Sequence, residues 1–256
     1  FAVSHGLPKA QILLGNFLVY QLPRAYIDWA HTYWQRAHGQ GQSRAAYQLA
    51  ISARTGRGGP VDLVRARALY EDAAQKGELR AAYEAARLHE ADKTEAGYQV
   101  ARRLYHDEIR RDPENRDALN SLAILYARGL GGPIDLDKAL SLILRLANDT
   151  LSPEGRACHN VAAIMLLKED LKSAQTAKRY FKRGADLNDA RASYEYARMC
   201  RDGRGGRKNL TEALKYAEHA VALGHDRAAL VAEIKEEKVG KKKPWQGDPA
   251  TQPLLY

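Results

Sequence analysis

The 256-residue sequence contains little cysteine, few signs of β-strands and no long apolar run. The alternation of apolar and polar residues that marks a half-buried strand is almost absent, so a β-sheet fold is excluded. The longest apolar stretch, 12–20, is shorter than the roughly 20 residues that a membrane-spanning helix needs. No transmembrane segment is therefore predicted.

The only two cysteines are Cys158 and Cys200. If the helices that carry them lie side by side, the two sulfur atoms are offset by roughly 10 Å along the helix axis. A disulfide bond does not reach across that distance without distortion. We interpret both cysteines as small residues of a buried core, and the redox compartment of the protein stays open.

A small residue recurs at nearly constant spacing along the whole chain. The successive spacings are 35, 36, 37, 39, 35 and 36 residues. The recurring residues are Ala10, Ala45, Ala81, Ala118, Ala157, Ala192 and Ala228. A period in this range with two helices per copy is typical of an α-solenoid, in which each copy buries its apolar face on the next. We therefore predict one elongated domain.

The stretch 191–224 is the clearest copy of the repeat. Its first helix places small or apolar residues on one face, at offsets 0, 4, 5 and 8 from the opening alanine. These residues are Ala192, Tyr196, Ala197 and Cys200. Gly203 is expected to end this helix, because glycine adopts the left-handed conformation that follows a helix C-terminus. Asn209 is the expected N-cap of the second helix, and Gly224 closes it.

Glycine-rich connections join the two helices in three of the copies. They are 56–60, 129–133 and 203–206, and in the first two an acid follows near the start of the second helix, Asp62 or Asp135. The copies that open at Ala81 and Ala157 lack these glycines. Their connections are expected to be shorter or differently angled.

Two copies show the full pattern of positions. In one copy these are Ala118, Leu122, Ala123, Tyr126, Gly129, Gly131, Asp135, Lys138 and Ala139. In the other they are Ala45, Leu49, Ala50, Gly56, Gly58, Asp62, Arg65, Ala66, Leu69, Tyr70 and Gly77. The pattern resembles the Sel1-like repeat family over roughly residues 8–238. The resemblance implies an all-α, right-handed α/α solenoid of helix-turn-helix repeats of about 36 residues, related to tetratricopeptide repeats.

We predict that this solenoid occupies 1–239 and that 240–256 forms an extended or disordered basic tail, because the tail contains three prolines and no helical period. The formal net charge is +9, from 40 basic and 31 acidic residues. This balance favours acidic partners. An acidic protein surface or an anionic polysaccharide fits better than nucleic acid, since no nucleic-acid-binding motif accompanies the charge.

The sequence contains no convincing catalytic, metal or cofactor site. The glycine connections match neither a P-loop nor a dinucleotide-binding motif, and the eight histidines show no metal-ligand spacing. Ser193 has no histidine near it in the sequence. His159 follows Cys158 directly and projects to another side of the helix, where it is poorly placed to act as a base. We predict a non-enzymatic protein, with a weak hydrolase as the less favoured alternative.

The side of the first helix that faces away from the core carries tyrosine and arginine. Offset 2 has Tyr47, Tyr83, Asn120, His159 and Tyr194, and offsets 6 and 9 have Arg54, Arg87, Arg198 and Arg201. Stacked first helices would align them in a stripe, and the family resemblance implies that this stripe lines the concave surface. Tyrosine and arginine contribute strongly to protein interfaces. Alternatively, the tyrosines at offset 2 pack between adjacent first helices.

A second predicted feature is a basic rim along the edge where the two helices of each repeat connect. Its members are Arg57, Arg128, Arg204, Arg207 and Lys208. We predict an interaction scaffold or adaptor of a bacterial envelope or secretion-related assembly. An immunity protein that neutralises a secreted toxin is the alternative. The resemblance implies a periplasmic or secreted protein, with a cytoplasmic location as the other possibility.

Overall fold

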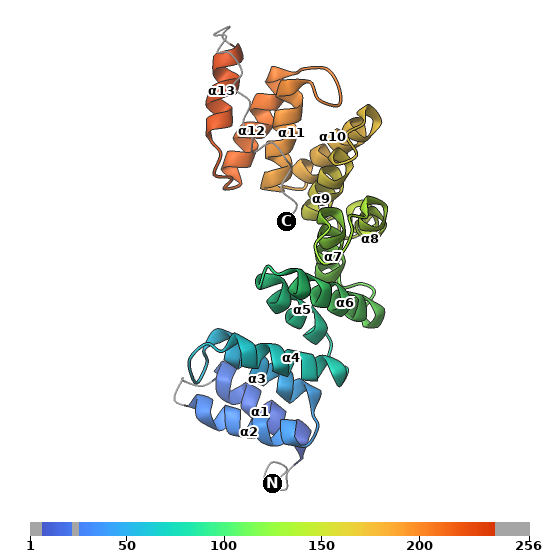
Figure 1. Cartoon of the computed structure of the whole chain (residues 1–256). Helices are drawn as coiled ribbons and strands as arrows, with labels where there is room; N and C mark the ends of the chain where they lie inside the picture. The colour runs from blue at the N-terminus through green and yellow to red at the C-terminus, as the bar shows by residue number, and fades with distance from the viewer. Residues whose placement is uncertain (1–6, 22–25, 239–256) are drawn as a thin grey trace. The chain divides into compact units, whose positions relative to one another are not determined.

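A computed structural model describes residues 7–21 and 26–238 of the chain (Figure 1). The proposed tail 240–256 lies outside the described residues. Within the described part every regular element is an α-helix. The helices are α1 (Pro8–Gln21), α2 (Ile27–Gly39), α3 (Ser43–Thr55), α4 (Leu63–Gln75), α5 (Ala81–Ala91), α6 (Glu95–Arg111), α7 (Arg116–Arg128), α8 (Leu136–Asn148), α9 (Gly155–Leu166), α10 (Leu171–Asp186), α11 (Ala190–Asp202), α12 (Leu210–Ala222) and α13 (Ala229–Lys238). The predicted all-α repeat fold is confirmed.

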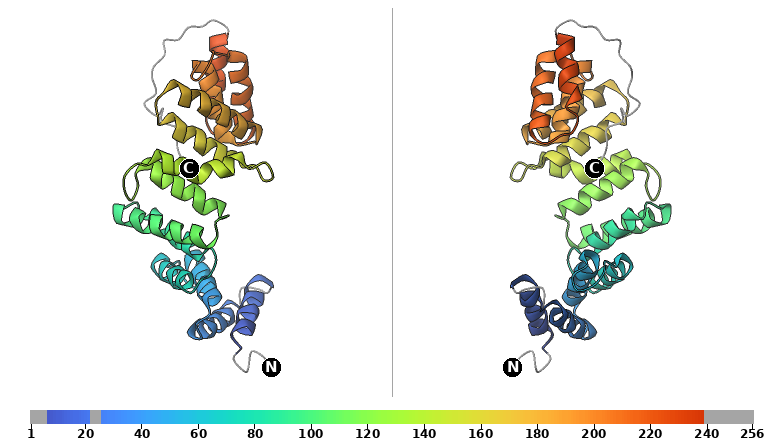
Figure 2. Two further views of the ribbon diagram at one scale, coloured as in Figure 1. Left: turned by 90° about the vertical axis from the view of Figure 1, so that its right-hand side faces the viewer. Right: turned by 90° about the vertical axis from the view of Figure 1, so that its left-hand side faces the viewer.

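Each repeat is a pair of helices. The odd-numbered helices, here called A helices, begin at or close to the recurring alanines, and the even-numbered B helices follow them. The pairs α3–α4 and α11–α12 lie side by side in all views (Figures 1 and 2). Among the helices of the described residues, none is both long and apolar enough to cross a membrane.

The helices divide into two compact units. Unit 1 contains the described residues up to Ala118 together with Leu130–Gly132, and unit 2 contains Leu119–Gly129 and the described residues from Pro133 onward. The sequence predicted one continuous solenoid without such a division. We describe each unit by itself.

Most B helices begin at a side-chain cap. The capping side chain accepts a hydrogen bond from the backbone N–H three residues further on, which satisfies a donor that the first turn leaves open. The capping residues are Asp62, Thr94, Asp135, Asp170 and Asn209. The predicted cap at Asn209 is confirmed, and the acids Asp62 and Asp135, which the sequence placed near the start of the second helix, are caps as well.

The glycine connections bring two repeats into direct contact. Gly56 and Gly203 end α3 and α11 in the left-handed conformation, as predicted. The glycine two residues further on touches the preceding B helix. A Cβ atom at Gly205 would lie 2.5 Å from the carbonyl oxygen of Ala174 in α10, and one at Gly58 would lie 2.5 Å from Cε1 of His31 in α2. Only glycine permits this approach without displacing a neighbour.

The other two connections are shorter, as the sequence indicated. They span 92–94 and 167–170, whereas the glycine connections span 56–62, 129–135 and 203–209. Lys93 and Glu169 adopt positive φ angles of 53° and 57° in place of glycine. A non-glycine residue in this region stores some backbone strain.

Alanines from both helices and large side chains from the B helices form the core. Trp34, Tyr70, Tyr105 and Phe181 are fully or almost fully buried among alanines with no exposed surface. Small residues on the A helices let the backbones approach closely while the large B-helix side chains fill the space. Cys158 and Cys200 are buried and unpaired, as predicted.

Candidate A-helix interaction faces

The offset-2 residues do not form the exposed stripe that the sequence indicated. Tyr83 and His159 retain only 9% and 3% of their accessible surface, and Asn120 is also buried. Tyr47 and Tyr194 are half-buried. The helical period places offset 2 away from the core of its own repeat, but a neighbouring helix covers it. The rings of Tyr83 and His159 contact Tyr105 and Phe181, which belong to the B helix of the same repeat.

Arginines stack on the three tyrosines. The guanidinium carbon lies 5.6 Å from the ring centre for Arg44 on Tyr47, and 5.8 Å for both Arg87 on Tyr83 and Arg198 on Tyr194. These distances fall within the range of cation–π attraction. Tyr194 also stacks in parallel on His225, with ring centres 4.5 Å apart. The aromatic and cationic residues of α3, α5 and α11 thus pack against one another within each helix.

Several of the predicted arginines interact with side chains of the protein itself. Arg198 donates to Glu195 at 3.2 Å and Arg201 donates to Glu233 at 2.6 Å. Their side chains are consequently only 17% and 16% exposed. Arg54 Nε donates to the Tyr70 hydroxyl at 3.3 Å, which raises the pKa of Arg54. Arg198 and Arg201 are thus engaged by acids and Arg54 by a tyrosine hydroxyl. Arg87 also lies 3.8 Å from the carboxylate of Glu84.

Burial also affects the acid beside Arg198. It raises the pKa of Glu195 despite the neighbouring guanidinium of Arg198. In unit 1, burial raises the pKa of Tyr47, and Glu84 acts in the same direction.

Further exposed cations of the A helices stand at a position that was not predicted from the sequence. The residue directly before the opening alanine is basic in six of the seven copies. These residues are Lys9, Arg44, Arg80, Arg156, Arg191 and Arg227, and all are exposed. The exception is Asp117. The regular recurrence of a basic residue at this offset was a readable signal in the sequence.

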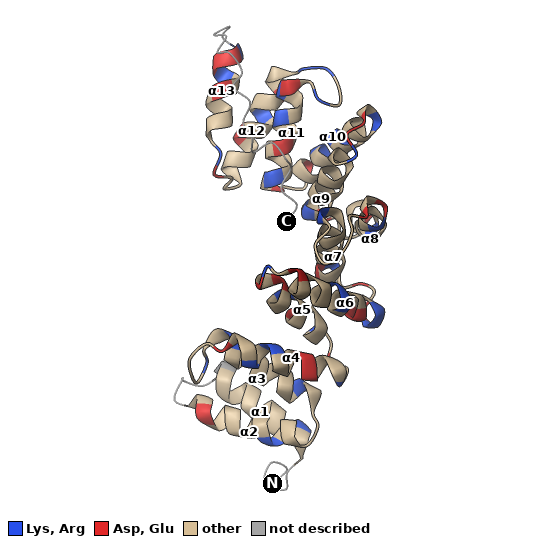
Figure 3. Cartoon of the chain, in the orientation of Figure 1, with Lys and Arg blue, Asp and Glu red and all other residues tan. Residues whose placement is uncertain are grey.

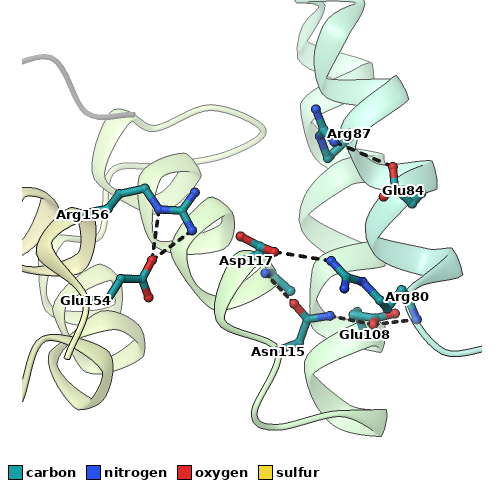
Figure 4. Close-up of polar contacts among 9 residues, drawn as sticks. Arg80, Glu84, Arg87, Glu108, Asn115, Asp117, Glu154 and Arg156 are labelled. Atoms are coloured by element: carbon teal, nitrogen blue, oxygen red, sulfur yellow. Dashed lines mark hydrogen bonds and ion pairs between the residues drawn. The ribbon is translucent and has the colours of Figure 1, made fainter. Parts of the chain in front are cut away.

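Figure 4 shows the polar contacts around the residue before the opening alanine in unit 1. Arg80 lies 3.5 Å from the carboxylate of Asp117, the residue that breaks the basic series. Glu108 of α6 is buried, and its Oε1 accepts hydrogen bonds from the Arg80 backbone N–H at 2.9 Å and from Asn115 Nδ2 at 2.8 Å. Asn115 Oδ1 in turn accepts from the backbone N–H of Ala118. Glu108 therefore fixes the start of α5 and the residue that caps α7.

We define the unit 1 face as Arg44, Tyr47, Arg80, Tyr83 and Arg87. The three arginine side chains are 54%, 56% and 55% exposed, whereas the acids beside Arg44 and Arg87, Glu78 and Glu84, are only 12% and 14% exposed. Tyr47 lies close enough to Arg44 and Arg80 for both charges to act on its hydroxyl. An approaching molecule would therefore meet more exposed cation than acid, since of the three matching acids only Asp117, at 37%, is well exposed.

The residues of the predicted basic rim are all exposed. Arg57 belongs to unit 1 and the other four belong to unit 2. The α11–α12 connection is strongly basic, as Figure 3 shows, and carries Arg204, Arg207 and Lys208. Lys208 pairs with Glu237 of α13. The rim is therefore concentrated in one connection of unit 2.

The fold also assembles a serine–histidine–asparagine group that spacing did not reveal. Ser193 Oγ lies 3.2 Å from His219 Nδ1, and His219 Nε2 lies 3.2 Å from Asn188 Oδ1. A nucleophilic serine needs such a base, but it also needs access to a substrate. Ser193 has no exposed surface, and its hydroxyl donates to the carbonyl of Asp189 at 2.9 Å. We interpret this group as an interhelical clamp.

The neighbouring residues Cys158 and His159 are likewise buried and closed to a substrate. Cys158 Sγ lies 3.5 Å from the carbonyl oxygen of Ala147, and burial raises the pKa of Cys158 to about 11. Burial lowers the pKa of His159. Across the described ranges, no three histidine, cysteine, aspartate or glutamate side chains gather as metal ligands would.

The family model of the Sel1 repeat matches residues 43–78, 116–149, 155–189 and 190–225. The chain belongs to the Sel1 repeat family. The helix pairs α1–α2 and α5–α6 lie outside the matched residues yet form the same two-helix unit. Sel1 repeat proteins generally mediate protein–protein interactions. No curated protein matches the chain significantly.

Three solved structures are similar to this Sel1 chain. A Sel1 repeat protein from Oxalobacter formigenes is 18% identical, with 96% of this chain and 90% of that chain covered and a TM-score of 0.52. A protective antigen of uropathogenic Escherichia coli is 18% identical, with coverages of 94% and 67% and a TM-score of 0.34. A putative Sel1 repeat protein from Klebsiella pneumoniae is 20% identical, with coverages of 91% and 95% and a TM-score of 0.26. The first of these supports the fold alone.

Proposed function

We propose that this Sel1 repeat protein is a non-enzymatic scaffold that holds an acidic protein segment on the unit 1 face. The observation that carries the proposal is the unequal exposure of charge on this face. The arginines are more than half exposed, whereas Glu78 and Glu84 lie largely beneath them. A carboxylate of the partner can use guanidinium donors that the internal ion pairs leave pointing outward.

The tyrosines give this face rigidity. Tyr47 packs edge-on against the buried Tyr70 with ring centres 5.4 Å apart, and Tyr83 packs against Tyr105. Each arginine stacked on such a ring loses less conformational freedom when it binds a partner, because its position is already restricted. Arginine and tyrosine are also the residue types that most often dominate protein interfaces.

Within the cell, we propose that the protein serves as an adaptor in a bacterial envelope or secretion-related assembly. Toxin neutralisation is the competing role, in which the same face would cover a secreted toxin. Both roles require an acidic partner surface, and an anionic polysaccharide would use the same cations. The chemistry of the captured partner separates these roles.

The test is the double charge reversal Arg44→Glu/Arg87→Glu in the full chain. The matched control is Arg110→Glu, because Arg110 is 77% exposed but lies on the B helix α6. We expect the double variant to lose capture of the native partner by at least tenfold, while the control and the helical circular dichroism of both variants stay unchanged. Full retention of capture by the double variant would overturn the proposal. Identification of the captured protein as a toxin would select neutralisation over the adaptor role.

A further inference from the structure

A polar cleft opens in unit 1 where α2, α3 and the first glycine connection meet. Its volume is about 310 Å³. The polar side chains that line it are His31, Gln35, Ser52, Arg57, Asp62 and Arg65. The backbone of Gly58 and Gly59 forms part of its wall. This cleft lies in the first of the three glycine-connected repeats.

Ser52 is a departure from the repeat pattern. It stands seven residues after the opening alanine Ala45, and the equivalent residue is large and apolar in each of the other five A helices that a B helix follows. These equivalents are Phe17, Leu88, Leu125, Ile164 and Met199. A serine lacks the volume of these side chains and adds a hydroxyl group. Departures of this kind from an otherwise consistent pattern concentrate at functional sites.

His31 completes the polar floor of the cleft. Its Nε2 lies 2.7 Å from Ser52 Oγ. The ring is held from the other side by the glycine connection, since a Cβ atom at Gly58 would lie 2.5 Å from His31 Cε1. Burial lowers the pKa of His31, Asp28 opposes this effect and Arg65 adds to it. The imidazole is therefore neutral near pH 7 and offers one donor and one acceptor.

The charges around the cleft leave a small positive excess. Arg57 and Arg65 each contribute a positive charge, and Asp62 contributes a negative one. Asp62 is fixed, because its carboxylate accepts a hydrogen bond from the Arg65 backbone N–H at 2.9 Å. The net formal charge of these three groups is about +1 at pH 7, with His31 neutral. A singly charged anion balances it, whereas a doubly charged phosphate would exceed it and meet Asp62.

We propose that this cleft binds one carboxylate group, with Arg57 and Arg65 supplying the charge and the Ser52–His31 pair supplying hydrogen bonds at the floor. A planar guanidinium suits a carboxylate because it can donate two parallel hydrogen bonds. The site is separate from the unit 1 face and does not depend on the function proposed above. The carboxylate can come from a small organic acid or from the end of a peptide chain.

The test follows the imidazole signals of His31 by NMR in the full chain. The probes are sodium acetate and an acetylated tripeptide with a free carboxylate end, titrated against sodium chloride and inorganic phosphate at equal ionic strength. We expect a saturable shift of the His31 signals with a carboxylate probe and a rise of the His31 pKa on binding. Saturation by acetate identifies a small acid as sufficient, and saturation only by the tripeptide identifies a chain end.

The matched variants separate binding from folding. Ser52→Leu introduces the residue that α5 and α7 carry at this position, so the fold should be retained while the affinity falls at least tenfold. Arg65→Ala removes an exposed side chain and should also weaken binding at least tenfold. Equal binding of phosphate and carboxylate would show that exposed charge alone attracts anions. That result would overturn the proposal. Unchanged binding in Ser52→Leu would overturn it too, and so would a lack of saturation with either carboxylate because only water fills the cleft.

Discussion

Gly131 lies against the backbone of Tyr98 so closely that a Cβ atom at Gly131 would stand 2.5 Å from the Tyr98 carbonyl carbon. Gly131 also has a positive φ of 76°, and its N–H donates to Glu95 at 3.3 Å. The glycine connection therefore joins the start of α6 by backbone atoms and one carboxylate. The glycine motif, which matches no phosphate-binding pattern in the sequence, is a structural joint.

Gly131→Ala should destabilise the protein by roughly 2–4 kcal/mol, because the left-handed conformation and the contact with Tyr98 both penalise a Cβ atom. Gly59→Ala is the matched control. Gly59 lies in the equivalent connection of the first glycine-connected repeat, with nothing within 4 Å of its Cβ position. The control should change the free energy of unfolding by less than about 1 kcal/mol. Chemical denaturation measures both, and equal effects would contradict this account of the motif.

Glu108→Ala should destabilise the protein by about 2–4 kcal/mol, because it leaves the N–H of Arg80 and the amide of Asn115 without their acceptor. Glu108→Gln should be milder, within about 1 kcal/mol of the wild type, since its amide oxygen can still accept both bonds. Among the described residues Oε2 of Glu108 has no hydrogen-bond partner, so loss of its charge removes little. Urea denaturation distinguishes the two variants. An equal loss in both would show that the carboxylate charge is essential.

The thiols of Cys158 and Cys200 should resist modification in the folded protein. Burial raises the pKa of Cys158 to about 11 and also raises that of Cys200. At pH 8 the thiolate fraction of Cys158 should be roughly 100-fold below that of an ordinary cysteine. Ellman's reagent should therefore react quickly only in denaturant, and the denaturant dependence should follow the loss of helix. Fast reaction in native buffer would contradict the observed burial.

His159→Leu should reduce the loss of stability at mildly acidic pH. Burial lowers the pKa of His159 below its ordinary value of 6.5, so the unfolded chain binds more protons than the folded protein as the pH falls through this range. The free energy of unfolding therefore falls with decreasing pH, by at most about 1.4 kcal/mol per pH unit for one group. His31 and His225 act in the same direction, so the variant should flatten the slope between pH 6.5 and 5 without abolishing it. An unchanged slope would contradict this role of His159.

Features that depend on a few neighbouring residues could be predicted from the sequence. The caps at Asp62 and Asn209 and the helix end at Gly203 follow from the conformational preferences of single residues next to a helix. The buried face of Ala192, Tyr196 and Cys200 follows from the helical period. Features of this kind recur in most repeats, so the fold could be predicted over almost the whole chain.

Features that depend on contacts between helices could not be predicted in the same way. The rings of Tyr83 and His159 contact Tyr105 and Phe181 on the following B helix, and the helical period of the A helix alone does not encode that packing. The pairs His31–Ser52 and Ser193–His219 are separated by 21 and 26 residues in sequence. His31 and Ser52 meet only after two repeats have packed, and Ser193 and His219 meet only after the two helices of one repeat have packed. The ion pair between Arg201 and Glu233 changed the predicted charge of the arginine stripe for the same reason.

The contacts of Gly131 and Gly205 with the preceding B helices have a consequence for protein engineering. Main-chain atoms make the close contacts at these joints, and at Gly131 the carboxylate of Glu95 adds one hydrogen bond. The outward-facing residues of the A helices can therefore be exchanged as a set while the frame that carries them is left intact. A library that varies Arg44, Arg80 and Arg87 would explore new specificities on an unchanged backbone.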